Sequence, residues 1–344
     1  MPTLQINRSN AFSLAAVLAV ALSSVPLCGQ TGVNVTTWQA TNSDAQVPSK
    51  NWAGGNPLRI AQLRWYQANL ARNSFTVGKT QNSNPYGMAF DGANIWTANN
   101  EGTVTKLRAS DGANLGNFEV GGVPIGIAFD GANMWVTNWR STGSITKLRA
   151  SDGKILGTFP LGSYPGWMAF DGENIWVANS PGVTKLQASD GKNLGTFELK
   201  SGGFAVAYDG TYIWVTGGDN PNSVTRFRQD GSKAGQFQVG RGSYGIAFDG
   251  ANVWVANHAD GTITKLRASD GKTLGTFEVG GSPYGVAFDG VNIWVSANVA
   301  LAELRASDGK RIGYFNANGG STGVAFDGAN IWVALSLGNI LLKF

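Results

Sequence analysis

The chain has 344 residues, including 48 glycines, and only 14% of its residues are charged. Its ordinary apolar content and plentiful aromatic residues exclude intrinsic disorder, which requires low hydrophobicity and high net charge. The formal net charge is +4, with basic residues spread along the chain, so the sequence lacks the basic stripe expected of a nucleic-acid partner. A single cysteine and a single histidine exclude an internal disulfide and a thiolate metal site.

Residues 1–30 predict a secretory signal peptide. Arg8 precedes the apolar run Phe12–Leu22, and Pro26 ends this region. The run is too short for a transmembrane span of ~20 residues. Cys28 stands where a lipoprotein signal places its lipidated cysteine, but Leu27 precedes it in place of a small residue. Ordinary cleavage is favoured, and lipidation stays open as the alternative.

Residues 31–73 form a linker and a short N-terminal extension. Thr31–Pro57 is polar and rich in Asn, Ser, Thr and Gly, which is typical of a linker. Leu58–Leu70 is more apolar and follows a proline, which predicts a short amphipathic helix. We expect this helix to pack as a cap on the domain that follows.

Residues 74–344 contain seven copies of one unit. Each copy carries Phe/Tyr-Asp-Gly, with a tryptophan five positions after the aspartate, and the aspartates are 38 to 41 residues apart. A second turn, Asp-Gly, lies between consecutive copies. The aspartates of the first motif are Asp91, Asp130, Asp171, Asp209, Asp249, Asp289 and Asp327, and the tryptophans are Trp96, Trp135, Trp176, Trp214, Trp254, Trp294 and Trp332.

The unit predicts four short strands. Gly285–Phe288 is typical of the first strand, Ile293–Val295 of the second, Thr262–Ala268 of the third and Leu274–Val279 of the fourth. Asp-Gly turns separate them, because glycine accepts the positive φ of tight hairpins. Four strands repeated every ~40 residues predict an all-β, seven-bladed β-propeller; a solenoid is the less favoured alternative.

The ends of the repeat region predict how the ring closes. The last copy stops after Asn339–Phe344, its third strand, whereas Ser74–Gly78 matches the fourth strand at Asn117–Gly121. We therefore expect an N-terminal strand to join the last blade and close the ring, which removes exposed strand edges.

Most repeated residues have an expected structural role. The tryptophans should pack between blades, and the aspartates should bond to backbone N–H groups in the turns. The lysines and arginines of the repeated Thr-Lys-Leu-Arg-Ala should form a solvated rim whose aliphatic stems cover apolar surface.

A ligand site is expected on the face where two sets of loops surround the central channel: those between second and third strands, and those from a fourth strand to the next first strand. Asn99, Asn138, Asn179 and Asn257 follow the tryptophan strand in four copies. Aromatic residues precede or begin the first strand at Tyr86, Trp167, Phe204, Tyr244 and Tyr284. A mouth lined by aromatic rings and amides is suited to a sugar, a peptide or another small ligand; turn capping by Asn and packing by the rings are the alternative.

The loops that differ between copies refine this prediction. Trp139 and Arg140 are adjacent, and both types are enriched at binding hot spots. Residues 217–223 form the longest polar loop, and His258 lies in the loop 257–260, near Arg241 and Tyr244. The predicted ligand-binding residues are Trp139, Arg140, Asn138, Asn179, Asn257, His258, Tyr86, Tyr244 and Tyr284.

Catalytic machinery is sparse. His258 is the one candidate general base, and no serine stands in a nucleophile-elbow motif. Glu101, Asp219 and Asp260 lie on the candidate face in different copies and fit at most a weak Ca²⁺ or Mg²⁺ site. No metal ligands or cofactors are therefore assigned from the sequence.

The units resemble those of YVTN-type surface proteins and virginiamycin B lyase-like propellers, on motifs such as Ser282–Gly290 followed by Asn292–Val295. The resemblance covers about 74–344. The lyase branch implies a Mg²⁺-dependent site with two histidines and a glutamate. Only His258 can match a histidine here, so the histidine pair is absent. Gluconolactonase-like propellers imply a divalent metal held by Glu, Asp and Asn. The YVTN-type branch implies exported bacterial surface proteins with interaction roles.

Together these features predict an exported bacterial protein, periplasmic, cell-surface or secreted. We expect a monomeric, non-enzymatic propeller that binds a small-molecule, glycan or protein ligand through its channel-face loops. The alternative is a metal-dependent lyase or lactone hydrolase centred near His258.

Overall fold

A computed structural model describes residues 74–218 and 220–344. The signal peptide, linker and extension predicted for residues 1–73, and Asp219, lie outside the described residues. Within these ranges the chain forms strands and no helix, and so no helix with the length and apolarity to cross a membrane. The strands are β1 (Ser74–Thr76), β2 (Pro85–Phe90), β3 (Asn94–Asn99), β4 (Thr103–Arg108), β5 (Asn114–Glu119), β6 (Pro124–Phe129), β7 (Asn133–Asn138), β8 (Ser144–Arg149), β9 (Ile155–Pro160), β10 (Met168–Phe170), β11 (Asn174–Ala178), β12 (Gly182–Gln187), β13 (Asn193–Glu198), β14 (Gly203–Tyr208), β15 (Ile213–Gly217), β16 (Ser223–Phe227), β17 (Lys233–Gln238), β18 (Ser243–Phe248), β19 (Asn252–Asn257), β20 (Thr262–Arg267), β21 (Thr273–Glu278), β22 (Pro283–Phe288), β23 (Asn292–Arg305), β24 (Arg311–Phe326), β25 (Ile331–Leu335) and β26 (Ile340–Lys343).

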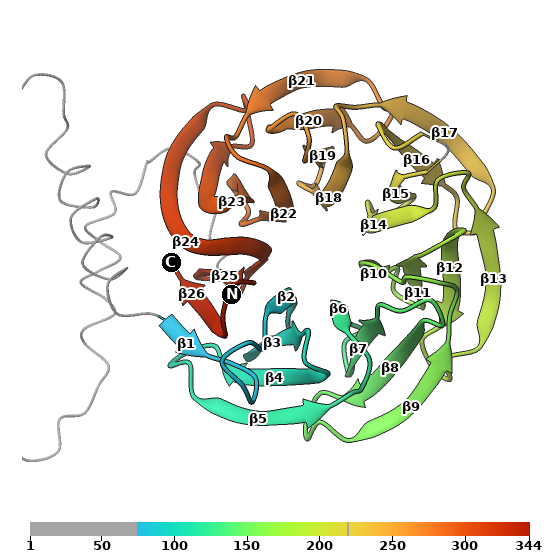
Figure 1. The fold of residues 1–344 in the computed structure, drawn as a ribbon. Helices are drawn as coiled ribbons and strands as arrows, with labels where there is room; N and C mark the ends of the chain where they lie inside the picture. The colour runs from blue at the N-terminus through green and yellow to red at the C-terminus, as the bar shows by residue number, and fades with distance from the viewer. Residues whose placement is uncertain (1–73, 219) are drawn as a thin grey trace, which may run out of the picture. The chain divides into compact units, whose positions relative to one another are not determined.

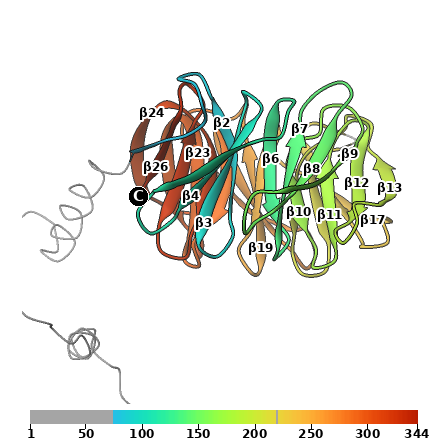
Figure 2. The same cartoon turned by 90° about the horizontal axis from the view of Figure 1, so that it is seen from below.

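The strands form antiparallel sheets of the β-propeller type. Five sheets have four strands in sequence order, such as β2-β3-β4-β5, and a sixth has the order β1-β26-β25-β24-β23-β22. Figure 1 shows the sheets arranged in a circle, with β2, β6, β10, β14, β18 and β22 toward its centre and β5, β9, β13, β17 and β21 on the periphery. Seen from the side, neighbouring sheets stand upright next to one another, with loops at both ends (Figure 2).

The six-stranded sheet contains the two longest strands and joins distant parts of the chain. β23 has 14 residues and β24 has 16, so each spans two strand positions of the repeat. β1 pairs with β26 through Ser74↔Leu342 and Thr76↔Ile340. The pairing that the sequence predicts between Ser74–Gly78 and the last copy is therefore present.

The Asp-Gly turn and the buried tryptophan form one unit of structure. In the first copy, Asp91 Oδ1 accepts the backbone N–H of Ala93 and Asn94, and Asp91 Oδ2 accepts the indole N–H of Trp96 at 2.7 Å. The same indole bond occurs in all seven copies. Burial raises the pKa of Asp91, but hydrogen bonds from the Trp96 indole, the Asn94 amide and the backbone together outweigh burial. The pKa of Asp91 therefore lies below its ordinary value. The motif therefore fixes the turn and the tryptophan together.

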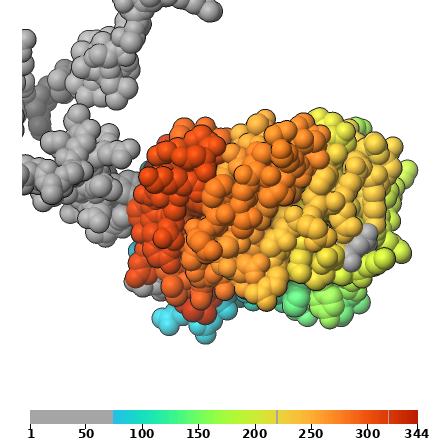
Figure 3. All heavy atoms as spheres, turned by 90° about the horizontal axis from the view of Figure 1, so that it is seen from above, coloured from blue at the N-terminus to red at the C-terminus, as the bar shows by residue number. Residues whose placement is uncertain are grey.

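Cations join neighbouring sheets. Lys106 is opposite Trp96 in the β3–β4 pairing, and its Nζ lies 4.9 Å from the ring centroid. The same ammonium donates to the carbonyl oxygen of Ala150 in the next sheet at 2.7 Å. We call this arrangement, in which a cation lies over a tryptophan ring and also donates to a carbonyl oxygen of the neighbouring sheet's turn, a cation clasp. Five more clasps are formed by Lys147 with Ala188, Lys185 with Gln229, Arg226 with Ala268, Lys265 with Ala306 and Lys343 with Ala109. In the space-filling view, the yellow, orange and red segments of the chain form one continuous surface (Figure 3).

The sequence-based prediction of a solvated rim is wrong for Lys106, Lys147 and Lys265, which are buried. Lys106 is only 7% exposed, because its aliphatic stem and ammonium cover the Trp96 ring. Arg108, two positions later, is exposed and pairs with Asp111 in the Asp-Gly turn. The two basic positions of the motif therefore differ: one closes the interface between sheets and the other is solvated.

Glu303 occupies the position that is a clasp cation in the other six copies. Its Oε1 accepts the Asn292 amide at 2.8 Å, whereas Asn94 in the first copy donates to Asp91. Burial raises the pKa of Glu303 to about 7, and the negative charge of Asp289 adds to the rise. At this interface a desolvated carboxyl replaces an ammonium.

Glu303→Gln is expected to stabilise the protein at pH 8 and to change its stability little at pH 5. The folded state holds the proton of Glu303 more tightly than the unfolded state, because the pKa of this carboxyl is raised from 4.5 to about 7 on folding. The contribution of Glu303 to stability is therefore largest at low pH and is lost as pH rises through about 7. Glutamine keeps the neutral form at both pH values. Thermal melting at the two pH values measures the difference, with Glu198→Gln on the exposed side of β13 as the control. An equal shift at pH 5 and pH 8 would contradict this expectation.

Candidate functional site

Glycines bring the first strands of neighbouring sheets close together near the centre of the circle. A Cβ on Gly245 would lie 2.1 Å from the carbonyl oxygen of Tyr284, and a Cβ on Gly323 would lie 2.0 Å from that of Tyr86. No larger residue fits at these positions without moving a backbone. Hydroxyl groups also link neighbouring sheets, since Thr216 of β15 donates to the Tyr244 carbonyl of β18 and Thr322 of β24 donates to the Pro85 carbonyl of β2. The close approach of Gly245 to Tyr284 brings the rings of Tyr244 and Tyr284 together.

The result is a cluster of rings that we call the aromatic mouth. Its members are Tyr86, Trp167, Phe204, Tyr244, His258 and Tyr284. Ring centroids lie 3.9 Å apart for Phe204 and Tyr244, 5.1 Å for Tyr244 and Tyr284, and 5.5 Å for Trp167 and Tyr284. Four residues predicted from the sequence, Tyr86, Tyr244, His258 and Tyr284, are thus brought together.

Tyr284 occupies the middle of the aromatic mouth and is uncharged at neutral pH. Burial raises the pKa of its hydroxyl above the ordinary value, and the neighbouring Tyr86 and Tyr244 add to this effect. Its ring contacts Tyr86, Trp167, Phe204, Tyr244 and His258. The centre of the mouth therefore presents an uncharged aromatic surface.

Two cavities open beside the aromatic mouth and share Tyr86 and Tyr284 in their walls. The Trp139 cavity, of about 280 Å³, is also lined by Trp139, Tyr164 and Asn100. The His258 cavity, of about 300 Å³, has a polar wall that includes Ser282, Asn298 and Ser336. A third space of about 170 Å³ is lined by Trp167, Phe204 and Tyr284 together with residues further along the first strands. The same three rings therefore separate this inner space from the Trp139 cavity.

An exposed aromatic pair forms the rim of the Trp139 cavity. Trp139 is 43% exposed and Tyr164 is 47% exposed, and their ring centroids lie 4.9 Å apart. Tyr164 has a φ of 51°, in the left-handed region that bulky residues rarely adopt. Its N–H donates to the carbonyl oxygen of Arg140 at 2.7 Å, which ties the two loops together. Arg140 is exposed beside this pair.

Sequence reasoning missed Tyr164 and Asn100. The segment 161–167 is the one connection between copies that contains two aromatic residues, Tyr164 and Trp167, and this departure is a signal available in the sequence. Asn100 follows the position at which four copies have asparagine. Its Oδ1 is buried and has no hydrogen-bond partner among the described residues, which no sequence pattern reveals.

The predicted asparagines are placed differently from the sequence-based expectation. Asn138, Asn179 and Asn257 are at most 4% exposed. Their side-chain N–H groups bond inside each sheet to the hydroxyls of Thr146, Thr184 and Thr264. They are buried because these threonines, on the adjacent strand, supply the acceptors. The structure does not bring these amides to the mouth. Direct contact between these buried side chains and a ligand stays a prediction.

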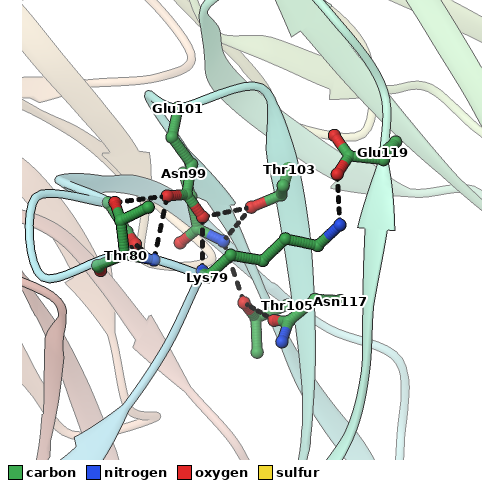
Figure 4. A network of polar contacts seen from close by, with 9 residues as sticks. Lys79, Thr80, Asn99, Glu101, Thr103, Thr105, Asn117 and Glu119 are labelled. Atoms are coloured by element: carbon green, nitrogen blue, oxygen red, sulfur yellow. Dashed lines mark hydrogen bonds and ion pairs between the residues drawn. The ribbon is translucent and has the colours of Figure 1, made fainter.

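The acidic residues considered for a cation are engaged in loop contacts. Glu101 accepts the N–H groups of Lys79 and Thr80 and the hydroxyls of Thr80 and Thr103 (Figure 4). Burial raises the pKa of Glu101, but these hydrogen bonds together outweigh burial, so the pKa of Glu101 lies below its ordinary value. Asp260 pairs with Arg241 at 2.6 Å. In residues 74–218 and 220–344, no three His, Cys, Asp or Glu side chains group together to hold a metal ion.

His258 belongs to the aromatic mouth through its ring. Its imidazole stacks on Tyr244 with centroids 4.6 Å apart and an interplanar angle of 25°. Nδ1 lies 3.1 Å from the carbonyl oxygen of Pro283, a contact in which Nδ1 donates if it carries the proton. These contacts orient the ring and leave it part of the wall of the His258 cavity.

The fold and the site define a β-propeller with an aromatic mouth at the centre of its sheets. A family model described as outer membrane protein assembly factor BamB matches residues 130–340, more than half of the chain. The chain belongs to this family. The curated proteins contain no sequence that matches the chain.

Proposed function

We propose that this chain is an exported, non-enzymatic β-propeller that binds a partner protein through the aromatic mouth and the Trp139 cavity. The observation that carries the proposal is the uncharged cavity beside the exposed pair of Trp139 and Tyr164. Tyrosine and tryptophan supply large contact areas at a low cost in conformational entropy, and both are enriched at protein-binding hot spots. The family description, an assembly factor, fits a role in protein interaction.

The proposed scaffold is a monomeric, closed ring of seven blades over residues 74–344. Seven Asp–Trp hydrogen bonds support the number of blades. The pairing of β1 with β26 and the bond from Thr322 to the Pro85 carbonyl support closure. In this proposal, residues 1–30 are the signal peptide of an exported bacterial protein, and residues 31–73 are its linker and N-terminal extension. Within the propellers, the unit at Ser282–Gly290 supports a relationship to the YVTN-type and virginiamycin B lyase-like branch.

The contacts of His258 favour binding over catalysis. A general base of the serine-hydrolase type bonds to a nucleophile on one side and to an orienting carboxylate on the other. The His258 ring instead packs against Tyr244 and Tyr284, and its Nδ1 contacts a backbone carbonyl. No metal or cofactor is part of the proposal.

Affinity capture from bacterial envelope extracts tests this function. The captured protein is identified, purified and titrated against the wild-type chain by surface plasmon resonance. Trp139→Ala with Tyr164→Ala is expected to weaken its binding about tenfold or more, since hot-spot truncations cost ≥ ~2 kcal/mol. The control is Leu156→Ala, a similarly exposed apolar residue on β9. Equal affinity of the double variant and the wild type would contradict the proposal.

A further inference from the structure

In the described residues, six junctions between neighbouring sheets share one contact. A glycine in the turn between the third and fourth strands of one sheet lies against the phenylalanine of the preceding sheet's fourth strand. A Cβ on Gly153 would lie 2.0 Å from the nearest carbon of the Phe118 ring, so a larger residue fits only if the ring moves. The other contacts join Gly112 with Phe75, Gly191 with Phe159, Gly231 with Phe197, Gly271 with Phe237 and Gly309 with Phe277. The cation clasps reach carbonyl oxygens of the same turns.

The junction between the sixth and last copies differs from these on both of its sides. On one side, Glu303 stands at the position of the clasp cation, and its carboxyl accepts the Asn292 amide of the same sheet. On the other side, the fourth strand of the last copy is β1, so the residues that precede β1 correspond to the turn. Residues 31–73 contain no Asp-Gly pair. The cation and the turn that bind each other elsewhere are therefore replaced together in this chain.

A groove of about 530 Å³ lies at this junction. Its wall includes Tyr314 and Phe315 of β24, Leu342 of β26, Phe344 and Ser74, the first residue of β1. The rings of Phe315 and Phe344 have centroids 5.8 Å apart. Consecutive Cα atoms are ~3.8 Å apart, so the chain that is joined to Ser74 begins at this groove.

The spacing of the repeat identifies the residues that correspond to the turn. In six copies the turn glycine precedes the fourth-strand phenylalanine by six positions, as Gly112 precedes Phe118. The same count back from Phe75 gives Asn69, so residues 66–69 correspond to the turn. Gly112 has a φ of 74°, and asparagine is among the non-glycine residues that most often adopt a positive φ. Asn69 suits this backbone, and the volume of the groove accommodates a side chain larger than that of glycine.

The strand register extends the same correspondence. In the first copy, residues 114 and 116 at the start of β5 pair with residues 107 and 106 of β4. Residues 71–73 correspond to 114–116, and 343–344 correspond to 106–107. The end of the last copy therefore offers residues 71–73 the same backbone partners that β4 offers β5.

We propose that residues 66–73 dock in this groove, with 66–69 in the place of the turn and 71–73 extending β1 along β26. The groove is then an interaction surface for the chain's own N-terminal extension. The helix expected from the sequence over 58–70 would end before residue 66. This inference does not depend on the proposed function.

The docked segment would leave the aromatic mouth open. β4 begins beside the Asn100 loop at the Trp139 cavity and ends at Arg108, next to the Asp-Gly turn. The turn position therefore lies at the end of each sheet away from the mouth. The extension would enter the domain on that face and leave the mouth accessible to a partner.

Hydrogen exchange followed by mass spectrometry tests the docking on the chain purified from cells that express the full sequence. After correction for intrinsic rates, the amides of residues 71–73 are expected to exchange at least about tenfold more slowly than those of 31–57, because strand pairing protects them. Exchange of 71–73 at the rate of an unstructured peptide overturns the proposal. Protection of 58–70 without protection of 71–73 indicates a helix and also overturns it.

Restoring both partners of the clasp gives a second test. One variant replaces residues 66–69 by Ala-Ser-Asp-Gly, another is Glu303→Lys, and a third combines them. The combined variant is expected to melt at least ~2 °C above the sum of the two single shifts, because the new ammonium can bind the carbonyl oxygens of the new turn. Ala-Ser-Asp-Gly placed at residues 46–49 is the matched control and should give additive shifts with Glu303→Lys. Additive shifts in both pairs overturn the proposal.

Gel filtration with light scattering shows whose segment fills the groove. Protection of 71–73 and the coupled melting shift in a monomer support docking within one chain. If both occur only in a dimer, the segment comes from a second copy and the proposal is overturned. Capture of a protein through Trp139 and Tyr164 tests the opposite face of the sheets, so the proposed function and this inference can fail separately.

Discussion

Replacing Ser74–Gly78 by a Gly-Ser linker of equal length is expected to destabilise the whole domain by about 3–6 kcal/mol, since burial of Phe75 and Val77 contributes ~1.5–3 kcal/mol each. Val77 is fully buried, and the Phe75 ring packs 5.1 Å from that of Trp332. The replacement also unpairs β26, whose edge would then be open to association with other chains.

Urea unfolding followed by circular dichroism measures this loss. Phe75→Leu is the matched control, because it keeps an apolar side chain against Trp332 and should cost less than ~1.5 kcal/mol. Unfolding of the linker variant within ~0.5 kcal/mol of the wild type would show that β1 contributes little to the domain.

Trp135→Ala is expected to cost about 3–5 kcal/mol, the usual range for truncation of a buried aromatic residue. Trp135 is fully buried between two partners: the Lys147 ammonium lies 5.1 Å from its ring centroid, and Phe159 lies 5.8 Å away. Its indole N–H also donates to Asp130 at 2.7 Å. The substitution therefore removes packing, a turn contact and the cation clasp to the next sheet.

Two substitutions divide these contributions in the same urea experiment. Trp135→Phe keeps an aromatic ring but leaves Asp130 Oδ2 without its indole donor, and should cost ~1–3 kcal/mol. Trp139→Ala, four residues later and 43% exposed, should change stability by no more than ~0.5 kcal/mol. Equal losses at Trp135 and Trp139 would contradict the division between structural and binding tryptophans.

Features that depend on residues close in sequence could be predicted from the sequence. The Asp-Gly turns and their tryptophans recur in each copy, and the structure places them as one hydrogen-bonded unit. The match of Ser74–Gly78 to a fourth strand predicted its pairing with the last copy, and β1 pairs with β26. The cation clasp was missed, because an alternating Thr-Lys-Leu-Arg strand is typical of a solvated face. The position of Lys106 is decided by Trp96 on the preceding strand and by Ala150 in the turn that follows β8 of the neighbouring sheet.

The candidate site depends on contacts between copies, and the sequence predicted it in part. Tyr86, Tyr244 and Tyr284 stand at equivalent positions, and strands held close by glycine bring their rings together. The asparagines also stand at equivalent positions, but their partners are threonines of the same sheet, which alignment of the copies does not reveal. Tyr164 departs from the repeat, so its place beside Trp139 follows from a single loop conformation.

Site-specific photo-crosslinking in living cells tests the central claim, that the partner binds at the aromatic mouth and the Trp139 cavity. A photoreactive phenylalanine analogue, which keeps an aromatic ring, replaces Trp139 at the rim of the cavity in one strain, and Leu156 on the peripheral strand β9 in another. The account predicts one defined protein adduct from position 139, identifiable by mass spectrometry, and none of that protein from position 156. Absence of an adduct at position 139, or the same adduct from both positions, would contradict it.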